Sequence, residues 1–252
     1  MIYIDRLIIG SLVSITAVTY YLPSYELASK ILFIPGSIMP VIFPVLTMSL
    51  VLNPIRAIDI FDKSVKYIFI ILFPLILIIF TFANEGLNIW VGSNIANHST
   101  LVLQILVVGV LINSLAHIPY NLVQASGRPD LTAKLHILEL PFYIIILVWL
   151  LTDYGIVGAA IAWTVRVLVD AIFLFLFTKK ILGITSLIKM RSIFITFVAL
   201  SLFATAFILQ SLVVKITFIF IALPIQFMMA WLLILGESER NIILNRLKSI
   251  FI

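Results

Sequence analysis

Charged side chains at helical spacing lie inside long apolar stretches of this chain. Arg166 and Asp170 are four residues apart in the apolar run 154–177, and Glu26 and Lys30 have the same spacing near the N-terminus. Residues four apart share a helix face, so each pair can neutralise its own charges. A charge facing lipid at mid-membrane costs at least about 2.5–3.5 kcal/mol. These side chains therefore face protein or a polar cavity, either along a substrate path or as ion pairs that hold helices together.

The segment QASGRPDLTAKLHILELPFY (124–143) carries a turn followed by titratable side chains. Pro129 biases the residue before it away from helix, which predicts a turn there. Asp130 is expected to cap the helix that follows. On that helix His136 and Glu139 are three residues apart and can form a proton relay, although such a histidine is more often only structural.

The residue types offer no catalytic or metal-binding set. The histidines His98, His117 and His136 fall in different predicted segments and lack metal-ligand spacing. The chain has no cysteine, which excludes disulfides and thiolate sites. We therefore expect a protein that is not an enzyme and that uses no cofactor or metal.

The composition is that of an integral membrane protein. Hydrophobic residues make up 63% of the chain and charged residues 11%, against about 25% charged in soluble domains. The mean hydropathy of +1.26 leaves too little polar surface for a water-soluble fold. Most lysines and arginines lie in short segments beside apolar runs, so the net charge of +5 indicates membrane topology and not nucleic-acid binding.

Six apolar runs after the first fifty residues predict membrane spans. They cover about 66–83, 100–122, 132–151, 156–178, 192–210 and 216–235. The lysines and arginines gather in alternate connecting segments, which predicts that those segments and the C-terminus are cytoplasmic. The predicted cytoplasmic segments are 51–66, 124–134, 179–191 and the tail after 236, and the predicted outer ones are 84–98, 152–155 and 211–215.

The first fifty residues allow two interpretations. One is a pair of spans, 7–23 and 31–52, separated by the polar stretch PSYELASK. The other is a single helix from a cap near Ser14 to about residue 50, bent at its prolines. That helix would be about 50 Å long, so it must tilt or kink. It would also place Glu26 and Lys30 near the middle of the membrane.

Four segments in register resemble one known family. Their order and spacing are similar to the C-terminal half of bacterial polysaccharide flippases, the O-antigen (Wzx-type) translocases of the multidrug/oligosaccharidyl-lipid/polysaccharide exporter superfamily. The segments are YYLPSYELASKILFIPGSIMPVIFP (20–44), NEGLNIWVG (84–92), QASGRPDLTAKLHILELPFY (124–143) and DYGIVGAAIAWTVRVLVDA (153–171).

The resemblance implies an all-α fold of two six-helix transmembrane bundles around a cavity that opens alternately to either side. It covers roughly residues 1–180, which we expect to form the C-terminal bundle with its first helix truncated. Residues 181–252 would add two transmembrane helices and a cytoplasmic tail. The resemblance favours the single long helix at the N-terminus. Because the first bundle is missing, we expect a fragment or half that needs a complementing half.

The function implied is transport of undecaprenyl-diphosphate-linked oligosaccharides across the bacterial inner membrane, for O-antigen and lipopolysaccharide biosynthesis. The implied partners are this lipid-linked substrate, membrane lipids, and a separate N-terminal half or polysaccharide assembly proteins, with no nucleic acid. A non-transporting remnant and a drug/cation antiporter of the same superfamily are alternatives. A membrane polymerase or ligase would need a larger outer loop than 84–98.

Roles for individual residues follow from the resemblance together with burial cost. Guanidinium and ammonium groups recognise phosphate, while carboxylates hold a coupling ion or keep the cations paired. The residues expected to bind substrate are Lys30, Arg6 and Arg166. Those expected to serve coupling or charge pairing are Glu26, Asp5 and Asp170, with His136 and Glu139 as a relay.

Overall fold

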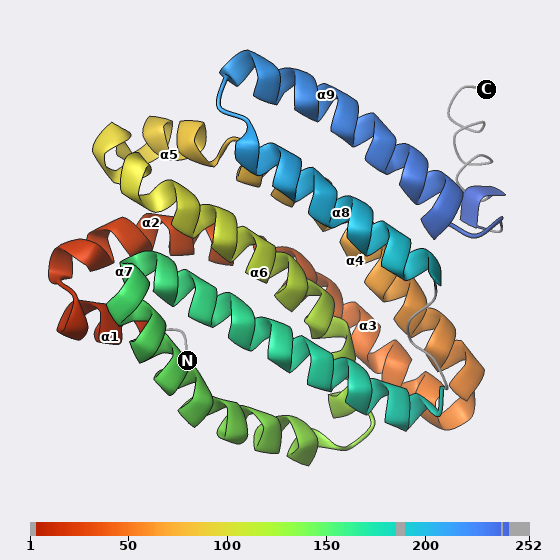
Figure 1. Cartoon of the computed structure of the whole chain (residues 1–252). Coiled ribbons are helices and arrows are strands. Elements are labelled where there is room, and N and C mark those ends of the chain that lie inside the picture. Colours follow the sequence, from red (N-terminus) through yellow and green to blue (C-terminus); the bar gives the residue numbers. More distant parts are fainter. Residues whose placement is uncertain (1–3, 185–189, 238, 242–252) are drawn as a thin grey trace. The chain divides into compact units, whose positions relative to one another are not determined.

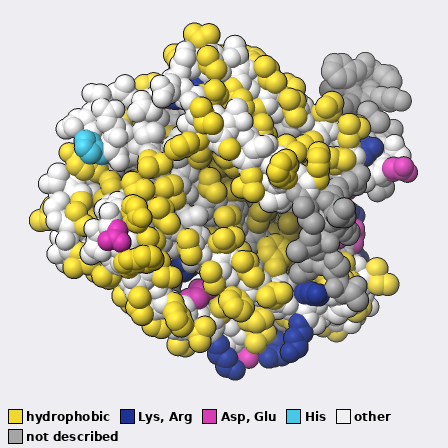
Figure 2. All heavy atoms as spheres, in the orientation of Figure 1, with side chains coloured by type: hydrophobic (Ala, Val, Ile, Leu, Met, Phe, Trp, Pro, Cys, Tyr) yellow, Lys and Arg dark blue, Asp and Glu magenta, His cyan; other side chains and the backbone are white. Residues whose placement is uncertain are grey.

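The computed structural model describes residues 4–184, 190–237 and 239–241, and within them the chain is helical with no strand. Hydrophobic side chains cover most of the face seen in Figure 2. The prediction of an all-α, multi-pass membrane protein is confirmed. Five described helical segments are long and apolar enough to cross a membrane: Ile15–Leu52, Pro54–Thr81, Ser93–Ala125, Pro129–Leu182 and Leu212–Ile234.

The chain divides into two compact units, residues 1–187 and 188–252. In the first unit, α1 (Ile4–Leu12) ends just before Ser14. The Ser14 hydroxyl oxygen accepts a hydrogen bond from the backbone N–H of Ala17 at 3.0 Å, and so caps the next helix.

That next helix, α2 (Ile15–Ile31), passes into α3 (Phe33–Leu52) through the single residue Leu32. The stretch PSYELASK lies inside α2 and does not form a loop. The prediction of one long helix is therefore confirmed, and the alternative of two separate spans is wrong.

Helix α6 (Ser93–Ala125) is the centre of this unit. It packs against α2, α3 and α7, and also against α4 (Pro54–Thr81) and α5 (Ala83–Val91) (Figure 1). The Asn53 side-chain oxygen caps α4 by accepting a hydrogen bond from the backbone N–H of Arg56 at 3.1 Å. Ser24 of α2 donates its hydroxyl to the Ser99 carbonyl of α6 at 2.8 Å, so buried polar contacts also join these two helices.

Helix α7 (Pro129–Leu182) has 54 residues and would be about 80 Å long if straight, far more than the roughly 30 Å of a hydrocarbon layer. It bends at Gly155, whose φ of 58° and ψ of −141° are not helical. The two arms, 129–154 and 156–182, then lie side by side as a hairpin (Figure 1). The bend falls in the predicted outer segment 152–155.

A buried cluster joins the hairpin to the central helix. Ala116 of α6 packs against Leu135 of the first arm and against Ala171 and Leu174 of the second. This packing fixes the rotation of both arms about their axes. The polar side chains that follow are held in place by it.

The start of α7 differs from the prediction. Arg128 is the N-cap residue and Pro129 is the first helical residue, so Asp130 lies inside the first turn and does not cap. Its carboxylate pairs instead with Arg128 at 3.1 Å and with Lys134 at 3.6 Å. A carboxylate in a first turn also interacts favourably with the helix dipole.

The second unit contains α8 (Met190–Ile208), α9 (Leu212–Met229) and the π-helical turn η1 (Ala230–Ile234). Helix α8 packs against α9, and η1 continues α9. Much of the predicted tail, at 238 and 242–252, lies outside the described residues. The division into a bundle of 1–180 and an addition of 181–252 stays a prediction.

Candidate functional site

A cavity of about 570 Å³ opens between α3, α6 and both arms of α7. The wall from α3 is apolar and rich in proline, whereas α6 and α7 supply polar and charged groups. The residues that line it are Gly36, Met39, Pro40, Phe43, Pro44, Asn113, Ala116, His117, Tyr120, Asn121, His136, Arg166, Asp170 and Leu174.

The polar wall from α6 was missed by the sequence analysis. Asn113, His117, Tyr120 and Asn121 follow the spacing i, i+4, i+7 and i+8, which places them on one helix face. The Asn121 amide donates to the His117 carbonyl at 2.7 Å and is thereby oriented. A polar stripe at this spacing within an apolar span was the signal that could have revealed the cavity.

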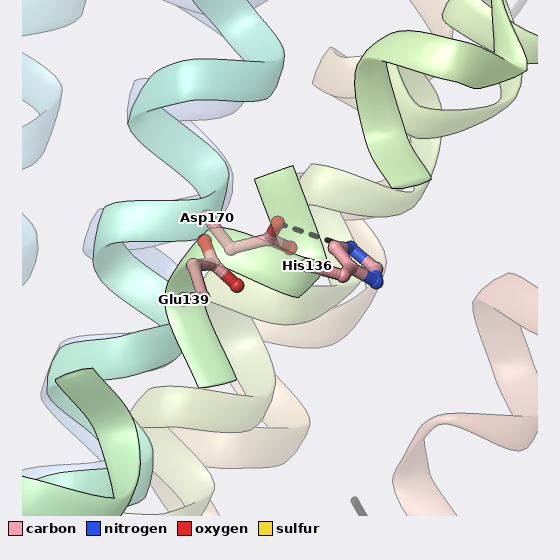
Figure 3. A group of neighbouring side chains, drawn as sticks. All are labelled: His136, Glu139 and Asp170. Atoms are coloured by element: carbon pink, nitrogen blue, oxygen red, sulfur yellow. Dashed lines mark ion pairs between the residues drawn. The ribbon is translucent and has the colours of Figure 1, made fainter. Parts of the chain in front are cut away.

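The two arms of α7 bring His136, Glu139 and Asp170 together, a group called here the acid–histidine cluster (Figure 3). One ligand atom from each residue lies within 4.8 Å of the others. His136 Nε2 is 3.3 Å from Asp170 Oδ1. Asp170, which helical spacing paired with Arg166, thus finds its partner on the other arm. Such a set of one imidazole and two carboxylates can hold protons or a metal ion.

A second group ties α1 to the hairpin. The Tyr143 hydroxyl donates to the carboxylate of Asp5, which is only 2% exposed. The Arg166 guanidinium lies 5.7 Å from the centre of the Tyr143 ring, within cation–π range. Tyr143 was not predicted, although its position four residues after Glu139 places it on the same face of the first arm.

The predicted pairing of Glu26 with Lys30 is wrong. Arg6 of α1 donates to Glu26 of α2 at 2.8 Å, and its guanidinium lies 4.8 Å from the centre of the Tyr25 ring. Because α1 packs beside α2, it brings the Arg6 guanidinium within hydrogen-bond distance of Glu26. Lys30 is exposed and has no ion-pair partner within residues 4–184.

The structure therefore separates the predicted residues into two sets. His136, Arg166 and Asp170 line the cavity together. Glu139 and Arg166 border a smaller, mostly apolar pocket of about 300 Å³ that is lined by both arms of α7. The residues Arg6, Glu26, Asp5 and Lys30 do not line the larger cavity. Their roles in anion binding and coupling stay predictions.

Comparison with known proteins adds to this geometry. Residues 1–100 match the family described as "Polysaccharide biosynthesis protein". A Shigella flexneri protein named "Putative O-antigen transporter" is 33% identical over 180 residues, which is 71% of this chain and 43% of that relative. The chain thus spans less than half the length of the curated relative that it matches.

Proposed function

Since this chain belongs to the polysaccharide flippase family of O-antigen transporters, we propose that it forms the C-terminal half of a translocase for lipid-linked oligosaccharides. The proposed substrate is an undecaprenyl-diphosphate-linked oligosaccharide, moved across the bacterial inner membrane for O-antigen assembly. An N-terminal half, on the same polypeptide or on another, would complete the cavity. The activity is transport and not catalysis.

The observation that carries the proposal is the 570 Å³ cavity among helices that are otherwise apolar. Its polar wall presents the Arg166 guanidinium together with the amides of Asn113 and Asn121. A guanidinium suits a diphosphate, and amides suit sugar hydroxyls. A simple cation would have no use for the guanidinium in this wall.

Loss of Arg166 tests the substrate role. Deleting the gene is expected to lower surface polysaccharide and to trap lipid-linked oligosaccharide in the cytoplasmic leaflet, because transport is blocked before assembly. Re-expression should restore the surface polymer. Arg166→Gln should not restore it, since the cavity then has no guanidinium for the diphosphate. The measurement is the polysaccharide ladder on a gel, together with membrane levels of each variant.

Arg128→Gln is the matched control, because Arg128 is an exposed arginine at the start of α7 and does not line the cavity. It should restore the ladder fully. Unchanged surface polysaccharide after deletion would refute the proposal and favour a non-transporting remnant. Full rescue by Arg166→Gln would remove Arg166 from the substrate role.

The proposed orientation places 51–66, 124–134, 179–191 and the C-terminus in the cytoplasm. The chain has no native cysteine, so single cysteines can report on each side. In intact spheroplasts, whose inner membrane is accessible from outside, Ser93→Cys should react with a membrane-impermeant maleimide. Ala133→Cys and Glu237→Cys should react only after lysis. All three side chains are exposed. Labelling of Ala133→Cys before lysis would invert the orientation.

A further inference from the structure

The acid–histidine cluster contains four buried polar atoms with no hydrogen-bond partner among the described residues. They are His136 Nε2, both carboxylate oxygens of Glu139 and Asp170 Oδ1. Glu139 is 5% exposed and Asp170 is 7% exposed. A buried carboxylate with no hydrogen bond to either oxygen, as in Glu139, is strongly disfavoured, so this group calls for a proton or a cation.

Arg166 compensates the cluster only in part. It is near enough to interact electrostatically with Glu139. Its guanidinium nevertheless lies over the Tyr143 ring, and neither Glu139 oxygen has a hydrogen-bond partner among the described residues. Arg166 and His136 are thus the cationic groups nearest to the two carboxylates, and neither donates a hydrogen bond to a Glu139 oxygen.

The geometry of the cluster fits ligands that converge on one centre. His136 Nε2 and Asp170 Oδ1 are 3.3 Å apart, as an ion pair. Two ligand atoms on a tetrahedral zinc ion, at about 2.0–2.2 Å from the metal, lie about 3.3–3.6 Å from each other. The ligand atom of Glu139 lies within 4.8 Å of the other two, so its carboxylate would have to move closer to complete the set.

We propose that His136, Glu139 and Asp170 bind a divalent first-row transition metal ion, of which zinc is the best-suited probe. One imidazole nitrogen with two carboxylate oxygens favours such an ion, whereas magnesium and calcium prefer oxygen ligands alone. A charge of +2 balances the two carboxylates. Sequence spacing did not reveal this site because its third ligand lies on the other arm of α7.

The site leaves one coordination position for an external ligand. His136 and Asp170 both line the large cavity, so that position faces a space where water or an oxyanion fits. The ion would also bridge the two arms of α7, because His136 and Glu139 belong to the first arm and Asp170 to the second (Figure 3). Binding is thus expected to stabilise the hairpin. The proposal does not depend on the transport activity.

Zinc binding to the purified chain tests the site directly. The full chain, carrying an affinity tag without histidines, would be stripped with chelator and titrated with zinc chloride against a chromophoric indicator. We expect one zinc ion per chain and a higher thermal unfolding midpoint with zinc. His136→Ala and Glu139→Gln should each weaken binding by at least about tenfold, because each removes one of three ligands.

His98→Ala is the matched control, since His98 is exposed on α6 and lies outside the cluster. It should bind zinc like the unmodified chain. Size-exclusion chromatography shows whether His136→Ala and Glu139→Gln fold. If one of them folds poorly, the zinc affinity of the other tests the site. Absence of saturable binding at neutral pH would overturn the proposal in favour of a protonated cluster. Equal affinity in both variants and the unmodified chain would show adventitious zinc only. No substrate is present, so neither result bears on transport.

Discussion

Replacing Gly158 with alanine is expected to abolish most of the yield of folded protein. Gly158 begins the second arm of α7, three residues after the bend at Gly155, and an added Cβ would collide with the backbone carbonyl of Leu150 on the first arm. A backbone atom cannot rotate away as a side chain can, so the hairpin must open. The cost should exceed the about 1–3 kcal/mol typical of an overpacked core.

The measurement is the monodisperse peak of a fluorescent fusion on size-exclusion chromatography after detergent extraction. Gly86→Ala is the control, because a Cβ on this glycine of α5 meets nothing within 4 Å. That variant should give the peak of the unmodified chain. Equal peaks for the two alanine variants would mean that the arms are not in close contact at the bend.

Reversing the charge of Arg6 is the second change with a large expected effect. Arg6→Glu would place two carboxylates where a guanidinium now meets Glu26 at 2.8 Å, next to the buried Asp5. The Arg6 and Glu26 side chains are 21% and 44% exposed, so solvent reduces the penalty to about 1–3 kcal/mol. The thermal unfolding midpoint of the detergent-solubilised chain should fall accordingly.

A charge swap distinguishes this ion pair from a general effect of charge. Arg6→Glu combined with Glu26→Arg should recover much of the lost stability, because the pair between α1 and α2 is restored in reverse. Lys63→Glu is the control, since Lys63 pairs with Asp59 within one helix and both side chains are well exposed. It should cost no more than about 0.5 kcal/mol. A double variant no more stable than Arg6→Glu would contradict the pairing.

The helices could be predicted because their signals are local. Continuous apolar sequence marks the spans, and a serine hydroxyl at residue 14 caps the helix that follows it, as its type predicts. Asp130 shows that a residue type alone does not decide which residue caps a helix. Its type also suits a cap, but the proline before it occupies the first helical position and moves Asp130 into the first turn.

The partners of the charged residues could not be predicted in the same way. Helical spacing identifies neighbours within one helix, and it suggested Lys30 for Glu26. The actual partner, Arg6, comes from a helix that packs alongside. Asp170 likewise meets His136 only because α7 turns back on itself. Spacing along the sequence does not predict how one helix is rotated and packed against another.

The hairpin of α7 has a consequence for how this region enters the membrane during synthesis. The first arm carries His136 and Glu139, while the second carries Arg166 and Asp170. Each polar group in hydrocarbon raises the free energy of insertion until it meets a partner. His136 of the first arm therefore meets its partner Asp170 only after the ribosome has made the second arm. The whole hairpin is the smallest part of this region that can enter the bilayer with this ion pair formed.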